Sequence, residues 1–381
     1  MDLNGTKELI SEIKKGNMVL LMDDEDRENE GDLILAGEKV NAEKINFMAK
    51  YGRGLICLAL NSSQSKKLNL NYMSLKNESR NQTAFTVSIE AKKGISTGIS
   101  AKDRATTIKV ATKNNVSKKD IVSPGHVFPI VAKDGGVLIR AGHTEASVDI
   151  SKLAKKNPSA VICEIMNEDG SMAKRDELIS FAKKHKLSIG KIEDLISYRL
   201  KKENFIKLKK KSDMFLGDQN FKINIFENKI DGSEHFALVK GKINKNILPR
   251  VRVISSNIVE NYLLGNKIPN SFSKTVTYFK KFKNCILVFI KDPNLKSVSA
   301  TLKDYQNKKY YKKGKDKLIR NYGLGAQILK KLNVKKMILV TKSRKKVIGL
   351  DGYNLSISKQ EIIWEFALLF PIITQIFQMT Y

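Results

Sequence analysis

The sequence is poor in cysteine, histidine and tryptophan: its 381 residues include three, four and one of them, respectively. This scarcity of cysteine excludes a disulfide-rich secreted scaffold. Each cysteine lies in a short apolar run, which predicts buried thiols in a reducing compartment. The first twenty residues are polar and charged, so we expect no signal peptide and a cytoplasmic location. The three residues are Cys57, Cys163 and Cys285.

Acidic residues are also scarce relative to basic ones, 39 against 69, which gives a formal net charge of +30. The imbalance is concentrated in residues 201–381, where 37 Lys and Arg accompany 13 Asp and Glu. Such a basic half could bind nucleic acid electrostatically. The lysines are spread through Asn- and Ile-rich sequence, however, and aromatic residues alternate with them only around residues 305–315. Specific nucleic-acid binding is therefore not expected.

One long apolar stretch, residues 362–381, contains no Lys or Arg. About 20 apolar residues are needed to cross a bilayer. Glu365, Pro371, Gln375 and Gln378 interrupt this stretch, and it has no basic anchor. A packed terminal segment, or an end altered by a shift of reading frame, is favoured over a membrane anchor. Membrane association is not expected.

The acidic residues that the sequence does have are concentrated near its start. Residues 23–32 carry seven carboxylates and one cation, Arg27, directly after an apolar stretch that predicts a buried strand. Crowded carboxylates repel one another unless a cation neutralises them, and Mg²⁺ prefers oxygen ligands. Two interpretations are open: a metal-binding loop, or a solvated acidic loop.

A second segment, residues 135–146, contains a glycine pair, a short apolar run and then Arg-x-Gly-His-Thr-Glu. Arg140 can grip a phosphate with its planar fork, and Gly142 lets the backbone approach a ligand closely. His143 can bind metal or move protons, and Thr144 adds a hydroxyl. His126 follows a Ser-Pro-Gly turn signal. For both histidines the alternative is a structural side chain without a ligand.

Hydrophobic patterning indicates an α+β protein. Helices are predicted near residues 6–15, 41–50, 173–185 and 192–201, with Asn41 as an N-cap. Strands are predicted at 85–89 and 137–139. A basic linker is predicted at 201–212, and the sequence shows no internal repeat.

Six stretches of the first half share the order and spacing of one enzyme family: 23–32, 83–91, 94–108, 124–129, 140–146 and 161–173. Residues 1–200 thus resemble 3,4-dihydroxy-2-butanone 4-phosphate synthase, an enzyme of riboflavin biosynthesis. The resemblance implies a helix–sheet–helix sandwich and a homodimer with active sites near the subunit interface.

The resemblance further implies conversion of D-ribulose 5-phosphate, a small sugar phosphate, into L-3,4-dihydroxybutan-2-one 4-phosphate and formate with Mg²⁺ or Mn²⁺. It makes Glu28 and His143 the metal ligands, and His126 and Glu164 the catalytic residues. The other acidic-loop carboxylates are expected to shape the local field or hold the loop. The residues implied in substrate binding are Arg27, Glu28, Asp32, Arg140, Ala141, Gly142, His143, Thr144 and Glu164.

The second half resembles GTP cyclohydrolase II, which is fused downstream in bifunctional riboflavin enzymes. The matching stretches are 234–239, 251–253, 319–329, 337–341 and 349–353. Active members hold zinc with three cysteines, whereas the aligned stretch here, residues 256–270, contains none. Zinc in such a site needs thiolates.

Other parts of the cyclohydrolase site have also changed. The family's catalytic Asp falls on Leu318, and residues 291–295 replace its GTP-binding loop. Arg320, Thr341 and Lys346 still match. We therefore predict an inactive, zinc-free domain that serves in dimerisation or regulation, or is a remnant.

The predicted domains are a synthase domain at 1–200, the linker at 201–212, a degenerate cyclohydrolase-like domain at 213–360 and an apolar tail at 361–381. Two functions are weighed: a lyase acting through the first half, and a non-catalytic scaffold or basic-surface binding protein. The lyase is favoured because the first half retains every matched site residue.

Overall fold

The structure, a computed structural model, describes residues 3–25, 27–74, 76–79, 83–243, 248–255, 271–291, 315–342 and 353–363. For residues 315–322 it describes the helix but not the side chains. The chain divides into two compact units, residues 1–199 with 314–316, and residues 200–313 with 317–381. Each unit contains a seven-stranded sheet together with helices, which confirms the α+β prediction.

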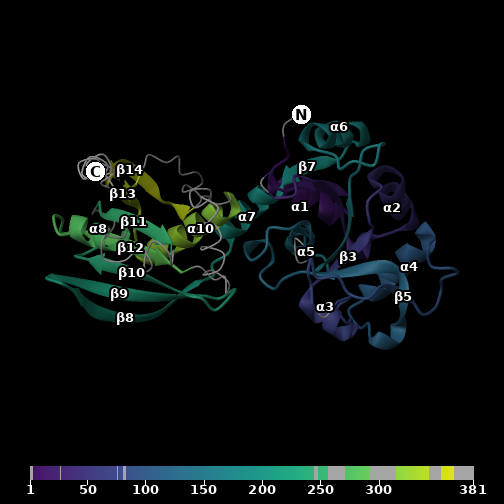
Figure 1. The fold of residues 1–381 in the computed structure, drawn as a ribbon, viewed down its shortest axis with the longest axis horizontal. Coiled ribbons are helices and arrows are strands. Elements are labelled where there is room, and N and C mark those ends of the chain that lie inside the picture. The colour runs from purple at the N-terminus through teal and green to yellow at the C-terminus, as the bar shows by residue number, and fades with distance from the viewer. Residues whose placement is uncertain are drawn as a thin grey trace, which may run out of the picture. The chain divides into compact units, whose positions relative to one another are not determined.

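The first unit is a mixed sheet of order β4-β5-β3-β6-β2-β1-β7 with helices packed on it (Figure 1). Its strands are β1 (Val19–Met22), β2 (Gly31–Ala36), β3 (Cys57–Leu60), β4 (Ile89–Ala91), β5 (Ile121–Val131), β6 (Ser159–Glu164) and β7 (Ser188–Lys191). Its helices are α1 (Thr6–Lys15), α2 (Ala42–Phe47), α3 (Ser62–Lys67), α4 (Ala101–Ala111), α5 (His143–Leu153), α6 (Arg175–His185) and α7 (Ile192–Lys202). A π turn follows α2 at Met48–Gly52, and 3₁₀ turns lie at Gly37–Lys39, Lys118–Asp120 and Gly136–Leu138.

The two faces of this sheet have different partners. On one face, Leu33, Leu35, Val161 and Cys163 join a buried core with residues of α2, α4 and α6. On the other, α5 packs against β2, β3 and β6 and contacts α1. Since side chains alternate along a strand, the residues next to the core positions point towards α5. The beginning of β2 lies beside the start of α5, and the end of β6 is its neighbour in the sheet.

Several local predictions are confirmed. Helix α1 spans the predicted residues and ends at Gly16, whose φ of 92° is the left-handed conformation that glycine adopts readily. Asn41 caps α2 as predicted, its Oδ1 accepting a hydrogen bond from Lys44 N at 2.9 Å. The cysteines are buried free thiols.

Two strand assignments differ. The 137–139 strand is wrong: Gly136–Leu138 is a 3₁₀ turn, because Asp149 of α5 accepts the Val137 N–H at 2.8 Å and no strand can then use it. The 85–89 strand is largely wrong, since only Ile89 belongs to β4, and Phe85 and Thr86 form isolated bridges. The turn expected before Val127 lies inside β5 as a bulge.

The second unit has the order β14-β13-β11-β12-β10-β9-β8. The pairs β8–β9, β9–β10 and β10–β12 are antiparallel, whereas β12–β11, β11–β13 and β13–β14 are parallel. The residues expected as a basic linker are occupied by the end of α7 and the first part of β8. The described elements of the second unit are β8 (Ile206–Leu216), β9 (Gln219–Asn228), β10 (Glu234–Lys240), β11 (Arg250–Ser255), α8 (Ser271–Phe279), β12 (Cys285–Ile290), α10 (Lys315–Lys331), β13 (Lys336–Thr341) and β14 (Ser356–Ile362).

Several predictions fall outside the described residues. These concern the zinc-aligned stretch 256–270, residues 292–295, Lys346 and the apolar tail from residue 364. Among the helices that the structure does describe, none has the length and apolarity needed to cross a membrane.

Candidate active site

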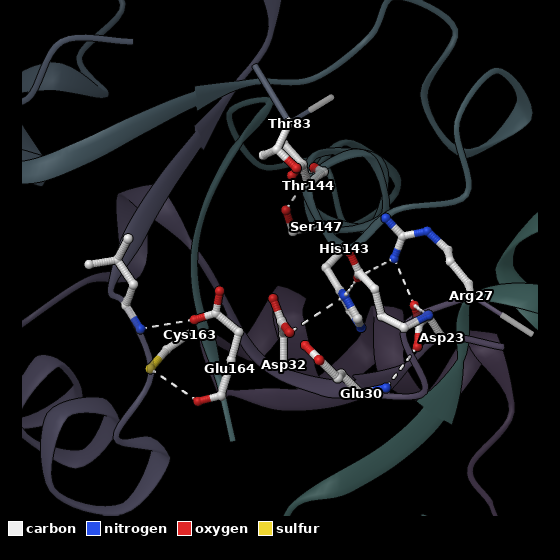
Figure 2. Close-up of polar contacts among 12 residues, drawn as sticks. Asp23, Arg27, Glu30, Asp32, Thr83, His143, Thr144, Ser147, Cys163 and Glu164 are labelled. Carbon is white, nitrogen blue, oxygen red and sulfur yellow. Dashed lines mark hydrogen bonds and ion pairs between the residues drawn. The ribbon is translucent and has the colours of Figure 1, made fainter. Parts of the chain in front are cut away.

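The centre of the site is a pair of carboxylates on neighbouring strands. Asp32, the second residue of β2, lies opposite Glu164, the last residue of β6, in the antiparallel register. Their sheet neighbours Leu33 and Cys163 belong to the opposite core, so Asp32 and Glu164 both project towards α5 (Figure 2). Glu164 Oε2 accepts the Leu55 N–H at 2.9 Å, which fixes its carboxylate.

The acidic loop between β1 and β2 is organised around Asp23. This side chain is 1% exposed and accepts hydrogen bonds from Arg27 Nη1 at 2.7 Å, Glu30 N at 2.9 Å and Glu28 N at 3.2 Å. Arg27 also pairs with Glu28. The prediction that some loop carboxylates hold the loop is thus confirmed for Asp23, which ties together the described residues Arg27, Glu28 and Glu30.

His143 opens helix α5 and faces this loop (Figure 2). Its Nδ1 lies 3.5 Å from Asp32 Oδ1 and 3.7 Å from Glu28 Oε2. Ligand atoms of Asp23, Glu28 and His143 all lie within 4.8 Å of one another. Segments more than a hundred residues apart in the sequence therefore converge on one cluster of hard oxygen donors and an imidazole.

Burial and neighbouring charges shift the pKa values of three groups in this cluster, Asp32, His143 and Glu28. Burial raises the pKa of Asp32 to about 7, and the neighbouring carboxylates Glu164 and Glu28 add to the effect. Burial alone would lower the pKa of His143, but Asp32 and Glu28 outweigh it and raise that pKa to about 9. For Glu28, burial is outweighed by His143 and Arg27, and the pKa falls to about 2. Such strong perturbation is typical of functional sites.

Two buried polar atoms of the cluster lack a hydrogen-bond partner among the described residues: Asp32 Oδ1 and His143 Nε2. The residues are 3% and 6% exposed, respectively. Buried polar atoms are almost always satisfied, and leaving one unsatisfied costs about 1–3 kcal/mol. A ligand that contacts both residues would remove this cost.

Arg140 lies just before α5. Its Nη1 donates to Glu145 Oε2 at 2.7 Å and its Nη2 donates to Thr83 Oγ1 at 3.1 Å. Glu145 is 1% exposed and also accepts the Lys133 N–H at 3.0 Å. A Cβ at Gly142 would collide with Arg140 Nη1, so a larger residue there would displace the guanidinium.

The turn that carries Arg140 is itself anchored. Asp149 accepts the Val137 N–H and pairs with Arg199 at 2.7 Å, and Arg199 also donates to the Gly135 carbonyl at 2.8 Å. This buried network anchors the turn at residues 135–137. Thr144, at the start of α5, is 5% exposed.

The residues 7–198 match the model of the 3,4-dihydroxy-2-butanone 4-phosphate synthase family, and residues 209–361 match that of GTP cyclohydrolase II. A 3,4-dihydroxy-2-butanone 4-phosphate synthase of Photobacterium phosphoreum is 41% identical over 94% of this chain and 98% of its own length. The chain belongs to the 3,4-dihydroxy-2-butanone 4-phosphate synthase family.

Other relatives extend over both units. The riboflavin biosynthesis protein RibBA of Aquifex aeolicus is 42% identical over 93% of this chain and 91% of its own length. The crystal structure of RibBX of A. baumannii, described as a two-domain synthase, has a TM-score of 0.82 at 38% identity and covers 94% of this chain and all of its own. A synthase crystallised with two magnesium ions has a TM-score of 0.51 at 38% identity over 52% of this chain and 98% of its own.

The site residues that the family resemblance implies are partly gathered by the fold. Arg27, Glu28, Asp32 and His143 form the cluster, with Glu164 next to Asp32 on the sheet. His126 pairs with Glu90, which does not belong to this cluster.

Sequence reasoning missed the residues that hold the site in place. Three of them, Thr83, Glu90 and Glu145, lie within the family-like stretches, which is the one signal that could have found them. A linear motif does not show which residues they contact. The missed residues are Thr83, Glu90, Glu145, Asp149 and Arg199.

Proposed function

We propose that the first unit converts D-ribulose 5-phosphate into L-3,4-dihydroxybutan-2-one 4-phosphate and formate, the reaction that supplies riboflavin biosynthesis. The four-carbon phosphate and formate together contain all atoms of the five-carbon substrate, so no redox partner is required. The observation that carries the proposal is the cluster of Glu28, Asp32 and His143, with its unsatisfied buried atoms, on a family-matching chain.

The cluster fits a divalent cation such as Mg²⁺ or Mn²⁺. Carboxylates and an imidazole suit these ions, and the ligand atoms lie within reach of one centre. We assign Glu28 and His143 as the ligands. When bound, the ion would act as a Lewis acid that stabilises negative charge on vicinal sugar oxygens.

The remaining residues bind the sugar phosphate and move its protons. Arg140, Thr144 and the N-terminus of α5 offer a fork, a hydroxyl and backbone N–H groups to the phosphate. Arg27 and Asp32, with the backbone of Ala141 and Gly142, contact the sugar. His126 and Glu164 serve as the general acid and base for transfers at carbon and oxygen.

The second unit is proposed to lack cyclohydrolase activity and zinc. Residues 201–381 contain a single cysteine, Cys285, which is buried in β12. Three thiolates therefore cannot meet in this half of one chain.

We also propose that the protein is a homodimer. Several large apolar side chains of the first unit are exposed, and burying such groups favours association. They are Leu55, Tyr72, Met73, Ile99 and Val122, between 42% and 61% exposed.

The test is incubation of the purified full chain with ribulose 5-phosphate and, separately, with GTP, each with EDTA and with added Mg²⁺ or Mn²⁺. Formate should appear from ribulose 5-phosphate only, vanish with EDTA and return with metal. Absence of formate from ribulose 5-phosphate under all conditions would refute the lyase. Release of pyrophosphate from GTP would refute the inactive second unit.

A further inference from the structure

His126 is held by the carboxylate of Glu90, a residue that has no role in the reaction proposed above. Its Nδ1 makes a close ion pair with Glu90 Oε1, and the two side chains are 45% and 15% exposed. The partners come from different strands, β5 and β4, and are separated by 36 residues. The imidazole therefore has one nitrogen committed to a shielded carboxylate, while the ring remains half-exposed.

The backbone builds this pair through a bulge. Ile89 pairs with Val127 and the next residue, Glu90, pairs with Val122, so residues 123–126 of β5 have no opposite partner in β4. Ser88 fastens the bulge: its carbonyl accepts from Ser123 Oγ at 2.7 Å, and its Oγ accepts the Gly125 N–H at 3.1 Å. Bulges often re-aim a side chain next to an active site, and this one turns His126 onto Glu90.

Two glycines enclose the pair. A Cβ at Gly98 would collide with the Glu90 carboxylate and lie 2.8 Å from His126 Nδ1, and a Cβ at Gly125 would collide with Glu90 Cγ. The loop around Gly98 is fixed by Asp103 of α4, whose Oδ2 accepts from Ser96 Oγ at 2.7 Å and from Gly98 N at 3.1 Å. Four segments thus cooperate to keep carboxylate and imidazole together.

We propose that Glu90 is a positioning residue that fixes the tautomer and orientation of His126. An ionised carboxylate can only accept hydrogen bonds, so Nδ1 carries the proton and Nε2 is left as the acceptor. A carboxylate in this position also stabilises the imidazolium that forms when Nε2 takes a proton from the substrate. This inference rests on the proposed function, in which His126 is a general acid or base.

The structure of the pair can be tested without turnover, by nuclear magnetic resonance of the ring nitrogens in ¹⁵N-histidine-labelled full-length protein. The chain has only four histidines, so His126→Ala identifies the signals of residue 126. In the wild type we expect the Nδ1–H tautomer, with Nε2 unprotonated. In Glu90→Gln, which can offer a donor as well as an acceptor, we expect a mixture of tautomers.

Turnover supplies the second readout. Glu90→Gln should lower kcat for formate release about 10- to 100-fold, with KM for ribulose 5-phosphate within about twofold of wild type, and Glu90→Asp should lie between the two. In a His126→Ala background, Glu90→Gln should have no further effect, because Glu90 acts through His126. Glu168→Gln, a matched change at an 88% exposed side chain, should resemble the wild type.

An Nε2–H tautomer in the wild type would overturn the proposal, even if Glu90→Gln failed to fold. So would a Glu90→Gln protein with unchanged kcat, or one whose loss persists at full size in the His126→Ala background. If the wild type releases no formate, the proposed function fails, and the tautomer still decides whether Glu90 positions His126.

Discussion

Each unit of this protein buries one histidine, His143 at the start of α5 and His235 on β10, and the two have opposite environments. His143 of the first unit lies among carboxylates that raise its pKa to about 9, and its Nε2 has no hydrogen-bond partner among the described residues. His235 of the second unit, on β10, accepts the Lys291 N–H at Nδ1 (3.1 Å) and contacts Ser233 Oγ through Nε2 (3.4 Å), and burial lowers its pKa.

The difference separates a binding group from a structural one. Both side chains are nearly inaccessible, at 6% and 1% exposure, so burial alone does not distinguish them. His235 is neutral, and both of its nitrogens have partners within the protein. His143 keeps one nitrogen unused beside a carboxylate oxygen that is also unsatisfied, an arrangement that is costly unless something else binds there.

Replacing each of these two histidines by alanine should give the largest difference in activity between two variants. His143→Ala should reduce formate release from ribulose 5-phosphate by about 1000-fold or more, because it removes a proposed metal ligand and with it the stabilisation of charge on the sugar oxygens. His235→Ala should leave formate release per folded molecule within about twofold of wild type. Comparable losses in both variants would end the distinction between the two sites.

A smaller effect is expected from Glu28→Gln, which removes a charge but keeps the side-chain length. Mn²⁺ should bind about 10- to 100-fold more weakly, measured by electron paramagnetic resonance, and formate release should recover partly at high metal concentration. Glu25→Gln is the control, because Glu25 is 64% exposed and pairs with Arg175. Unchanged Mn²⁺ affinity in Glu28→Gln would remove Glu28 from the proposed ligands.

Glu145→Gln should have a more modest effect, confined to binding of the phosphate. The buried carboxylate holds Arg140 Nη1 at 2.7 Å, so its loss should let the guanidinium reorient. We expect KM for ribulose 5-phosphate to rise about 10-fold, in proportion to one charge-assisted hydrogen bond, with kcat less affected. Glu12→Gln on α1 is the control. If KM stays unchanged, Glu145 does not orient Arg140 for the substrate.

The fold also shows which elements can be predicted from the sequence alone. Helix α1 could be predicted because its periodicity is local, and α2 because Asn41 caps its own first turn. The 137–139 strand was mispredicted because the group that takes the Val137 N–H is Asp149, twelve residues later on α5. Local apolar character could not reveal that competition.

The same limit applies to the site. The acidic loop and the segment around His143 stand out by composition. Only the sheet register, however, places Asp32 opposite Glu164, and only the packing of α5 brings His143 close to Asp32. Supporting residues such as Glu90 and Glu145 carry no signal of their own, because an isolated glutamate in a sequence is usually a solvated side chain. Their partners become known only when the strands are paired.

The smallest predicted effect concerns stability of the second unit at acid pH. Burial lowers the pKa of His235 in the folded state, whereas the unfolded chain protonates near pH 6.5. Below that value the unfolded state binds more protons, so the free energy of unfolding should decrease as the pH falls, by at most about 1.4 kcal/mol per pH unit. His235→Gln should remove this part of the slope in urea titrations of the full chain between pH 7 and 5. Glu168→Gln should retain it; an unchanged slope in His235→Gln would mean that folding does not lower the pKa of His235.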